Sequence, residues 1–504
     1  MAPVYVGSID QGTTSSRFLV FDTTGAVVAS HQVEYEQIFP ETGWHEQNPD
    51  RLLESVELSI ERAVENMRGH GLDPAGIKAI GITNQRETTV CWDSETGKAL
   101  CNAIVWDDTR TKDIVAQLAD KHPSKSRDGT RPLCGLPLTT YFSAVKLRWM
   151  LDNVPAVKAA DEKGTLRFGT VDSWLIYKLT GGKVHATDVT NASRTMLMDI
   201  NTLQWSDEAL EFFGFGRHVL PKICSSSEVY GDITAGPLAG IPIAGCLGDQ
   251  QAATVGQRCF APGEAKNTYG TGCFMIFNTG DKVVQSENGL LTTVAYKLGP
   301  DAPVAYGLEG SVAVAGSAVQ WLRDDLQLVK SAPEIDVLAS SVPDNAGVYF
   351  VTAFSGLFAP YWRDDARGCI VGLTRYAKRG HIARATLESV CYQTRAILEA
   401  MDRDSGDALR TLNVDGGLTN SDLCMQIQAD ILQISVSRPG MRETTAMGAA
   451  MAAGLATGVW SSVEELRGVG VAESKLFSPQ ITKEKADEMY AKWNAAVERS
   501  YNWA

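Results

Sequence analysis

The sequence predicts an α/β fold with two related halves, and three observations support this prediction. Two short apolar runs flank a polar tip within residues 4–22, which is typical of a β-hairpin. The compact apolar run Ile77–Thr83 predicts a strand that is buried on both faces. Residues 265–278 repeat the order of strand, Gly/Thr tip and strand. Because 504 residues are too many for one core, we expect two large domains, residues 1–255 and 256–504.

The tip of the first hairpin combines a carboxylate, a glycine, four consecutive hydroxyl side chains and an arginine. Gly12 allows the backbone a close approach, and amides with short hydroxyl side chains can hold a phosphate. Asp10 is placed to hold a divalent cation, and Arg17 adds a fixed positive charge. The tip therefore predicts a phosphate site, with an ordinary turn between two core strands as the alternative.

Between the hairpin and the buried strand, the sequence predicts an amphipathic helix. Asn48 suits the N-cap and Pro49 the first helical position. Apolar residues recur at helical spacing from Leu52 to Met67, so one face of the helix is expected to be buried. Strands followed by a helix and a further strand indicate the start of a mixed α/β domain.

A polar turn, residues 84–89, directly follows the buried strand. In open α/β sheets, ligands bind beyond the carboxyl ends of the strands. The adjacent Arg86 and Glu87 offer donors and acceptors, which suits a polyhydroxyl substrate because each hydroxyl both donates and accepts. A solvent-exposed ion pair is the alternative. Trp106 is a candidate pocket wall, although a tryptophan in the core is the commoner case.

Asp249 follows another apolar strand and begins a helix of small residues. This position puts it at the same sheet edge as Arg86 and Glu87. A carboxylate there can accept a proton from a substrate hydroxyl. An aspartate at a helix start is also a common N-cap, and the two roles can coexist.

The second half contains two further glycine turns. Residues 270–272 lack the third glycine and the following helix of a dinucleotide fingerprint, which excludes a Rossmann site. Gly416-Gly417 stands between a strand and a helix, where it lets a flat ring approach and favours a phosphate. A tight strand–helix turn is the alternative. Residues 312–329 predict a helix that includes Gln320.

Composition narrows the class of protein. An apolar fraction of 44% and a charged fraction of 21% are those of a globular enzyme. The net charge of −14 argues against nucleic acid or an anionic membrane as a partner. No apolar run is long enough to span a bilayer. The ten scattered cysteines contain no Cys-x-x-Cys pair, and the sequence shows no signal-peptide pattern, so we expect reduced thiols and a cytoplasmic location.

Six stretches together resemble the FGGY carbohydrate kinases and span essentially the whole chain: Asp10–Arg17, Asn84–Thr89, Tyr141–Lys146, Gly248–Ala252, Asn267–Phe274 and Asp415–Gly417. The resemblance implies two actin-like (RNase H-like) domains with mixed sheets flanked by helices and an ATP cleft between them. The first domain would provide the polyol site and the first phosphate loop, and the second domain would provide the nucleotide side.

The resemblance also implies individual roles. Asp249 would be the general base, with Asp10 and Arg17 completing the catalytic set and Asp10 holding Mg²⁺. The polyol would be bound by Arg86, Glu87, Trp106, Tyr141, Asp249, Gln250 and Phe274. The nucleotide would be bound by Thr13, Thr14, Ser15, Arg17, Thr271, Gly316, Gln320, Gly417 and Ser421. Many family members have asparagine where this chain has Ser421, and here Asn420 stands one residue earlier.

Within the family, the resemblance is to members that phosphorylate glycerol. It implies Mg²⁺- and ATP-dependent conversion of glycerol to sn-glycerol 3-phosphate by a homodimer or homotetramer. A kinase acting on a pentulose, gluconate or a tetritol is the nearest rival, although pentulose kinases resemble Met-His-Gly where this chain has Arg86-Glu87. A non-metabolic actin-like ATPase is the rival from another class, and such a protein has no use for the polar set around Asp249.

Overall fold

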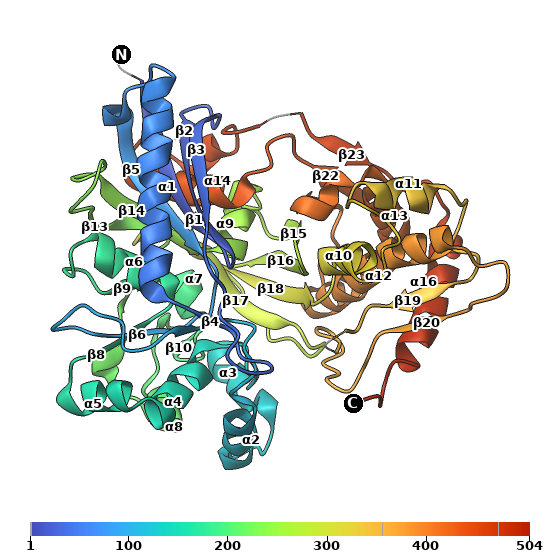
Figure 1. Cartoon of the computed structure of the whole chain (residues 1–504), viewed down its shortest axis with the longest axis horizontal. Helices are drawn as coiled ribbons and strands as arrows, with labels where there is room; N and C mark the ends of the chain where they lie inside the picture. Colours follow the sequence, from blue (N-terminus) through green and yellow to red (C-terminus); the bar gives the residue numbers. More distant parts are fainter. Residues whose placement is uncertain (1–2, 355, 472) are drawn as a thin grey trace.

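The computed structural model describes residues 3–354, 356–471 and 473–504. It contains one mixed sheet from the first half of the chain and another from the second half, each flanked by helices (Figure 1). The first sheet has the strand order β13-β14-β5-β1-β2-β3. Its strands are β1 (Tyr5–Gln11), β2 (Ser15–Asp22), β3 (Val27–Glu34), β5 (Ile77–Asn84), β13 (Ser227–Asp232) and β14 (Pro242–Gly248).

The predicted hairpin is confirmed as the antiparallel pair β1–β2, in which Asp10 lies opposite Arg17. The predicted buried strand is β5, which runs parallel to both β1 and β14 in the middle of the sheet. This arrangement brings the carboxyl ends of β5 and β14 to one edge, where the polar turn and Asp249 follow. The sheet topology thus brings the two predicted polar segments together.

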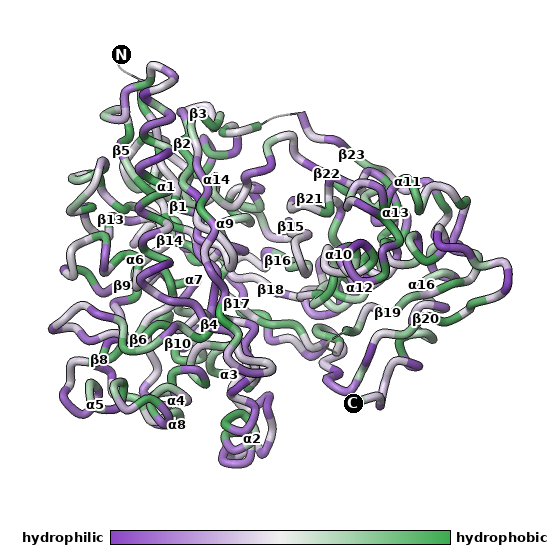
Figure 2. The backbone as a smooth tube through the Cα atoms, in the orientation of Figure 1, coloured by the Kyte–Doolittle hydropathy of each residue, from purple (hydrophilic) through white to green (hydrophobic). Residues whose placement is uncertain are grey.

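The predicted helix is α1 (Pro49–Gly69), and the side chain of Asn48 caps it by accepting a hydrogen bond from Asp50 N at 2.9 Å. Its buried residues share one face and pack against β2 and β3. Hydrophobic and hydrophilic residues accordingly alternate along this helix in Figure 2. The opposite face of the sheet is covered by α9 (Asp249–Gly256) and α14 (Thr444–Ala456).

Helix α14 comes from near the end of the chain and packs closely on the first sheet and on α9. A Cβ atom at Gly448 would lie 1.8 Å from the carbonyl oxygen of Ala252, so only glycine permits this approach. Residue 255 remains our proposed domain boundary along the chain, with α14 as an excursion of the second half.

The second sheet has the strand order β17-β18-β16-β15-β21-β22-β23. Its strands are β15 (Ala265–Tyr269), β16 (Cys273–Gly280), β17 (Leu291–Lys297), β18 (Val304–Val312), β21 (Thr411–Asp415), β22 (Ser435–Arg438) and β23 (Lys475–Phe477). Besides α14, the helices of this half are α10 (Gly316–Asp324), α11 (Glu334–Ser340), α12 (Arg379–Ser405), α13 (Asp422–Leu432), α15 (Val463–Leu466) and α16 (Lys483–Glu498). The predicted strand, Gly/Thr tip and strand at residues 265–278 is confirmed as β15–β16.

The prediction of one helix over residues 312–329 is wrong at both ends. Val312 ends strand β18, and α10 covers only Gly316–Asp324. The small apolar residues between these two elements fit a strand or a helix equally well by periodicity. Contact with the tip decides the local structure, because Gly316 N donates to the carbonyl oxygen of Gly270 at 3.0 Å.

The remaining elements surround the first sheet or form short pairs. The helices are α2 (Lys112–Lys121), α3 (Arg131–Cys134), α4 (Ser143–Asn153), α5 (Pro155–Lys163), α6 (Val171–Leu179), α7 (Val189–Ala192) and α8 (Asp207–Phe213). The strands are β4 (Glu46–Gln47), β6 (Val90–Asp93), β7 (Ala103–Ile104), β8 (Leu166–Gly169), β9 (Ala186–Asp188), β10 (Met198–Asp199), β11 (Gln204–Trp205), β12 (Lys222–Cys224), β19 (Tyr349–Val351) and β20 (Cys369–Val371). Within the described residues, none of the helices combines the length and apolar character needed to cross a membrane. All ten cysteines lie in the described part of the chain and are free thiols.

Candidate active site

Arg86 and Glu87 lie in the buried turn that follows β5, so the alternative of an exposed ion pair is wrong. Glu87 has a φ of 59°, in the left-handed region that non-glycine residues rarely adopt. Such a conformation costs on the order of 1–3 kcal/mol and persists only where the surrounding structure enforces it. The surrounding structure therefore holds the Glu87 backbone in a strained conformation, as is common at functional sites.

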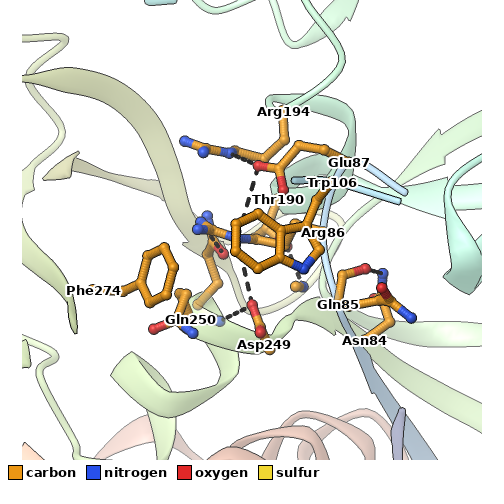
Figure 3. A network of polar contacts seen from close by, with 12 residues as sticks. Asn84, Gln85, Arg86, Glu87, Trp106, Thr190, Arg194, Asp249, Gln250 and Phe274 are labelled. Carbon is orange, nitrogen blue, oxygen red and sulfur yellow. Dashed lines mark hydrogen bonds and ion pairs between the residues drawn. The ribbon is translucent and has the colours of Figure 1, made fainter. Parts of the chain in front are cut away.

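Asp249 begins α9 directly after β14, at the edge where Arg86 is located (Figure 3). Arg86 Nε lies 3.4 Å from Asp249 Oδ1, and the backbone N–H of Gln250 donates to the same oxygen at 2.7 Å. Burial raises the pKa of the Asp249 carboxyl, and the positive charge of Arg86 opposes this rise. A carboxylate with a raised pKa, half-buried at a sheet edge, is suited to accept a proton.

Three aromatic side chains form a wall beside these charges. The ring centroid of Trp106 lies 5.6 Å from that of Tyr141 and 6.2 Å from that of Phe274, both with edge-to-face geometry. Trp106 Nε1 also donates to Thr13 Oγ1 at 3.0 Å. The wall therefore contacts the first hairpin tip through Trp106, while Phe274 lies just beyond the second tip on β16.

The predicted polyol residues form two contacting sets that Lys266 joins by bonding to Gln250 and to Phe274: Arg86, Glu87, Asp249 and Gln250, and Trp106, Tyr141 and Phe274. They come from the turn after β5, the return after β7, the start of α4, the start of α9 and strand β16. Such a combination of charged donors and acceptors beside an aromatic wall can bind a small molecule that has several hydroxyl groups and a carbon backbone.

Lys266, which the sequence analysis did not select, completes this group. Its ammonium on β15 is buried and donates to Gln250 Oε1 at 2.5 Å and to the carbonyl oxygen of Phe274 at 3.3 Å. Burial lowers the pKa of Lys266 to about 8, although the charges of Asp415 and Asp249 oppose this change. A lysine inside an otherwise buried strand, next to a Gly-Thr-Gly tip, is the sequence signal for this residue.

Glu309 and Arg194 were also missed. Glu309 is the charged residue in the middle of strand β18, and Arg194 follows the short helix α7. Glu309 forms ion pairs with Arg86 and Arg194, and Arg194 forms a second one with Glu87. Charged residues are almost never fully buried unless they are paired, so a glutamate in an apolar strand signals a buried partner. The sequence does not indicate which residue that partner is.

The first hairpin tip has its predicted charges in place. Arg17 forms an ion pair with Asp10 across the hairpin and another with Glu443 at 2.6 Å, just before α14. Gly12, Thr13 and Thr14 form the turn and Ser15 begins β2, and Gly12 N donates to the carbonyl oxygen of Ser15 at 2.9 Å. The Thr14 side chain is exposed. Hydroxyls and backbone amides at an open tip of this kind can hold a phosphate.

Asp10 is 7% exposed and is the candidate ligand for a divalent cation. Mg²⁺ usually binds one or two carboxylates together with substrate phosphates and water, so a single carboxylate beside a phosphate tip fits such an ion. Within the described residues, the group of three metal-ligating side chains that lie close together is Asp172, Asp188 and Cys246, away from this tip. Both of its carboxylates accept hydrogen bonds from threonine hydroxyls, so the group is satisfied by the protein itself.

A cavity of about 360 Å³ lies in the second half of the chain. Its lining includes every nucleotide residue predicted for this half: Thr271, Gly316, Gln320, Gly417 and Ser421. Asn420 lines it too. The hydroxyl of Ser421 caps α13 by accepting from Cys424 N at 2.9 Å and donates to Asp336 at 2.5 Å. The side chain of Ser421 is therefore engaged within the protein, although the residue borders the cavity.

Comparisons with known proteins identify the family of this chain. The model of the FGGY family of carbohydrate kinases, N-terminal domain, matches residues 5–256, and the C-terminal domain of the same family matches residues 265–457. The chain belongs to the FGGY family of carbohydrate kinases. The predicted family resemblance is therefore confirmed.

Similar proteins include glycerol kinase 1 of Streptomyces coelicolor, which is 56% identical over 99% of this chain and 98% of its own length. The glycerol kinase of Chloroflexus aurantiacus is 54% identical, with 99% of each chain covered. Among solved structures, Plasmodium falciparum glycerol kinase with ADP has a TM-score of 0.92 at 38% identity, over 99% of this chain and 98% of the other. The predicted fold, with two actin-like α/β domains, is confirmed by this match.

A solved structure of lower sequence identity shares the fold. Xylulose kinase from Lactobacillus acidophilus has a TM-score of 0.86 at 23% identity, with 99% of both chains covered. At this level of identity the likeness shows the shared architecture alone. A shared fold does not fix the substrate, which depends on the side chains of the site.

Proposed function

We propose that this FGGY kinase transfers the γ-phosphoryl group of ATP to a terminal hydroxyl of glycerol, giving sn-glycerol 3-phosphate and ADP for glycerol catabolism. The observation that carries the proposal is the group of charged side chains, Arg86, Glu87 and Asp249, that lies beside the aromatic wall of Trp106 and Phe274. The high identity to curated glycerol kinases along the full chain supports the same substrate.

Asp249 is the proposed general base. It takes the proton from the terminal hydroxyl while the oxygen attacks the γ-phosphorus and ADP departs. A positioned base contributes roughly 10²- to 10⁴-fold to the rate. Arg86 and the backbone N–H of Gln250 hold the carboxylate in place from two directions. Phosphoryl transfer asks the protein for little covalent chemistry beyond this proton removal. Positioning of the substrates therefore supplies most of the remaining rate enhancement.

The first hairpin tip is the proposed binding site for the transferred phosphate. Thr13, Thr14 and Ser15 provide hydroxyls and amides there, and Arg17 provides a positive charge next to Asp10. Asp10 would hold Mg²⁺, which neutralises phosphate charge when it is bound with the nucleotide. The cavity lined by Thr271, Gly316, Gln320 and Gly417 is the proposed site of the nucleoside portion of ATP, with Asn420 and Ser421 at its border.

The experiment is a coupled assay of ADP release with purified protein, ATP and Mg²⁺, with and without glycerol. We expect ADP release that depends on glycerol and a product that a glycerol 3-phosphate dehydrogenase oxidises. A panel of pentuloses, gluconate and tetritols tests the nearest rivals, and a preference for a five-carbon ketose would reject glycerol as the substrate. ADP release that is indifferent to every acceptor would instead indicate an actin-like ATPase.

A further inference from the structure

Four charged side chains pack together beneath the polyol pocket, shielded from solvent. Arg86 and Glu87 are 3% and 1% exposed, and Arg194 and Glu309 are both 0% exposed. Their formal charges cancel, with two positive and two negative groups. Isolated buried charges are strongly destabilising, so four of them persist only if each is paired. Arg86 and Glu87 belong to the proposed polyol site, and Glu309 and Arg194 contact them from within the protein.

Glu309 binds the end of the Arg86 guanidinium with both of its carboxylate oxygens. Arg86 Nη1 donates to Glu309 Oε2 and Arg86 Nη2 to Glu309 Oε1, each at 2.7 Å. A two-point contact of this kind fixes the plane of a guanidinium as well as its position. The Nε side of Arg86 then faces the pocket, with Asp249 Oδ1 at 3.4 Å from Nε.

Arg194 holds the Glu87 carboxylate from the side away from the pocket. Its Nε donates to Glu87 Oε1 at 2.5 Å. Among the described residues, the other Glu87 oxygen has no hydrogen-bond donor, which leaves it as an acceptor for a substrate hydroxyl. The Arg194 guanidinium also lies over the rings of Tyr141 and Phe142, with its carbon 5.4 Å and 5.1 Å from their centroids. One arginine therefore supports both Glu87 and the aromatic wall.

Glu309 joins the two arginines into one unit. Arg194 Nη1 donates to Glu309 Oε2 at 3.2 Å, the same oxygen that Arg86 uses. Glu309 itself is fixed in the middle of β18, opposite Ile276 on β16 and Leu291 on β17. Although burial raises the pKa of Glu309, Arg194 and Arg86 lower it to about 2, so this carboxylate stays charged in any ordinary assay.

We propose that Glu309 and Arg194 are positioning residues for the polyol site. Glu309 fixes the donor edge of Arg86, and Arg194 fixes the acceptor oxygen of Glu87, so that both groups meet substrate hydroxyls in one orientation. Neither residue touches the reacting atoms. The inference rests on the proposed function in that the bound molecule is a polyol.

Charge compensation alone is the competing explanation. On that view, Glu309 and Arg194 merely neutralise buried charges, and any carboxylate or cation at these positions serves equally. Glu309→Asp and Arg194→Lys separate the two explanations, because each variant keeps its charge. The aspartate carboxylate is one methylene shorter and loses the two-point contact, and lysine lacks the planar fork of arginine.

The test measures KM for glycerol, KM for ATP and the melting temperature for the full-length wild type and both variants. We expect KM for glycerol to rise about 10- to 100-fold in each variant, the usual effect of losing a hydrogen bond to a charged group. We expect KM for ATP to stay within about twofold of wild type, since the nucleotide cavity is built from other residues. Glu388→Asp is the matched control, because Glu388 is also buried and paired with an arginine, Arg384, at 3.0 Å on α12.

Several results would overturn the proposal. A wild-type KM for glycerol in both Glu309→Asp and Arg194→Lys would show that charge alone matters. Equal rises in both KM values, matched by the control Glu388→Asp, would show a general structural effect. If a variant folds poorly, calorimetry of glycerol binding to its folded fraction distinguishes the positioning role from charge compensation. Failure of the proposed function gives a different result, because the wild type itself would then release no ADP in response to glycerol. KM of the wild type and the variants is then measured for whichever polyol the wild type phosphorylates.

Discussion

Asp249→Asn is the most direct perturbation of the proposed chemistry. The amide has nearly the shape of the carboxylate, so the turn between β14 and α9 has no steric reason to change. The variant still has an oxygen for the contact with Gln250 N, which donates to Asp249 Oδ1 at 2.7 Å in the wild type. It loses the negative charge beside Arg86 Nε and the ability to accept a proton.

The expected magnitude follows from the role of the base. Removing it costs about 10²- to 10⁴-fold in kcat, or roughly 3 to 5 kcal/mol of transition-state stabilisation. Glycerol binding changes much less, because Arg86, Glu87 and the aromatic wall remain. We therefore expect a large fall in kcat with a modest change in KM for glycerol.

The pH dependence provides an independent check. The carboxylate form of Asp249 is the active form, and burial raises its pKa above that of an ordinary aspartate. The wild-type kcat/KM is therefore expected to fall as the pH drops through this raised pKa, and the fall begins at a higher pH than an exposed aspartate would give. This acid limb disappears in Asp249→Asn. The assignment is refuted if the variant turns over glycerol within tenfold of wild type, or if the acid limb survives unchanged.

Three further predictions concern other parts of the structure. Gly448→Ala puts a Cβ atom 1.8 Å from the carbonyl oxygen of Ala252, so we expect a loss of about 3 kcal/mol or more and a lower melting temperature. Gly69→Ala meets nothing within 4 Å and should leave that temperature nearly unchanged. Ser421→Ala removes the α13 cap and should cost about 1 kcal/mol of stability in thermal melts. Its KM for ATP should change less than about threefold, because the hydroxyl already bonds within the protein. Lys266→Met removes the donor to Gln250 Oε1 at 2.5 Å, so KM for glycerol should rise about tenfold in steady-state assays, and an unchanged value would contradict this role.

Much of the fold could be predicted because its signals are local in sequence. The first hairpin, the cap of α1 at Asn48 and the strand-to-helix turn at Asp249 each depend on a few neighbouring residues. Their local conformation depends on turn geometry and side-chain type, and a short stretch of sequence is enough to specify both. The helix expected over residues 312–329 failed where small apolar residues suit both kinds of structure, and contact with the tip at Gly270 decided between them.

The buried ion pairs that hold the residues of the candidate site could not be predicted in the same way. Arg86 and Glu309 are separated by 223 residues, and Arg194 and Glu309 by 115. The sequence shows that Glu309 is a charged residue in an apolar strand, which indicates a buried partner without identifying it. Arg86 and Arg194 lie in polar stretches, which give no such signal. Tertiary packing makes that choice, because only the meeting of β18 with the turn after β5 brings the three groups together.

Contacts at the start of α14 also join segments that are distant in sequence, although none of the six stretches that resemble the family includes it. Glu443 pairs with Arg17 on β2 at 2.6 Å, and its neighbour Thr444 donates to Asp415 on β21 at 2.5 Å. Two consecutive residues therefore connect the first hairpin tip to the strand that leads toward the cavity in the second half of the chain. Because a chain segment this short has almost no slack, a shift of one half relative to the other must break or strain one of these contacts. The sequence identifies both tips, while this link between them arises only when the end of the chain returns to cover the first sheet.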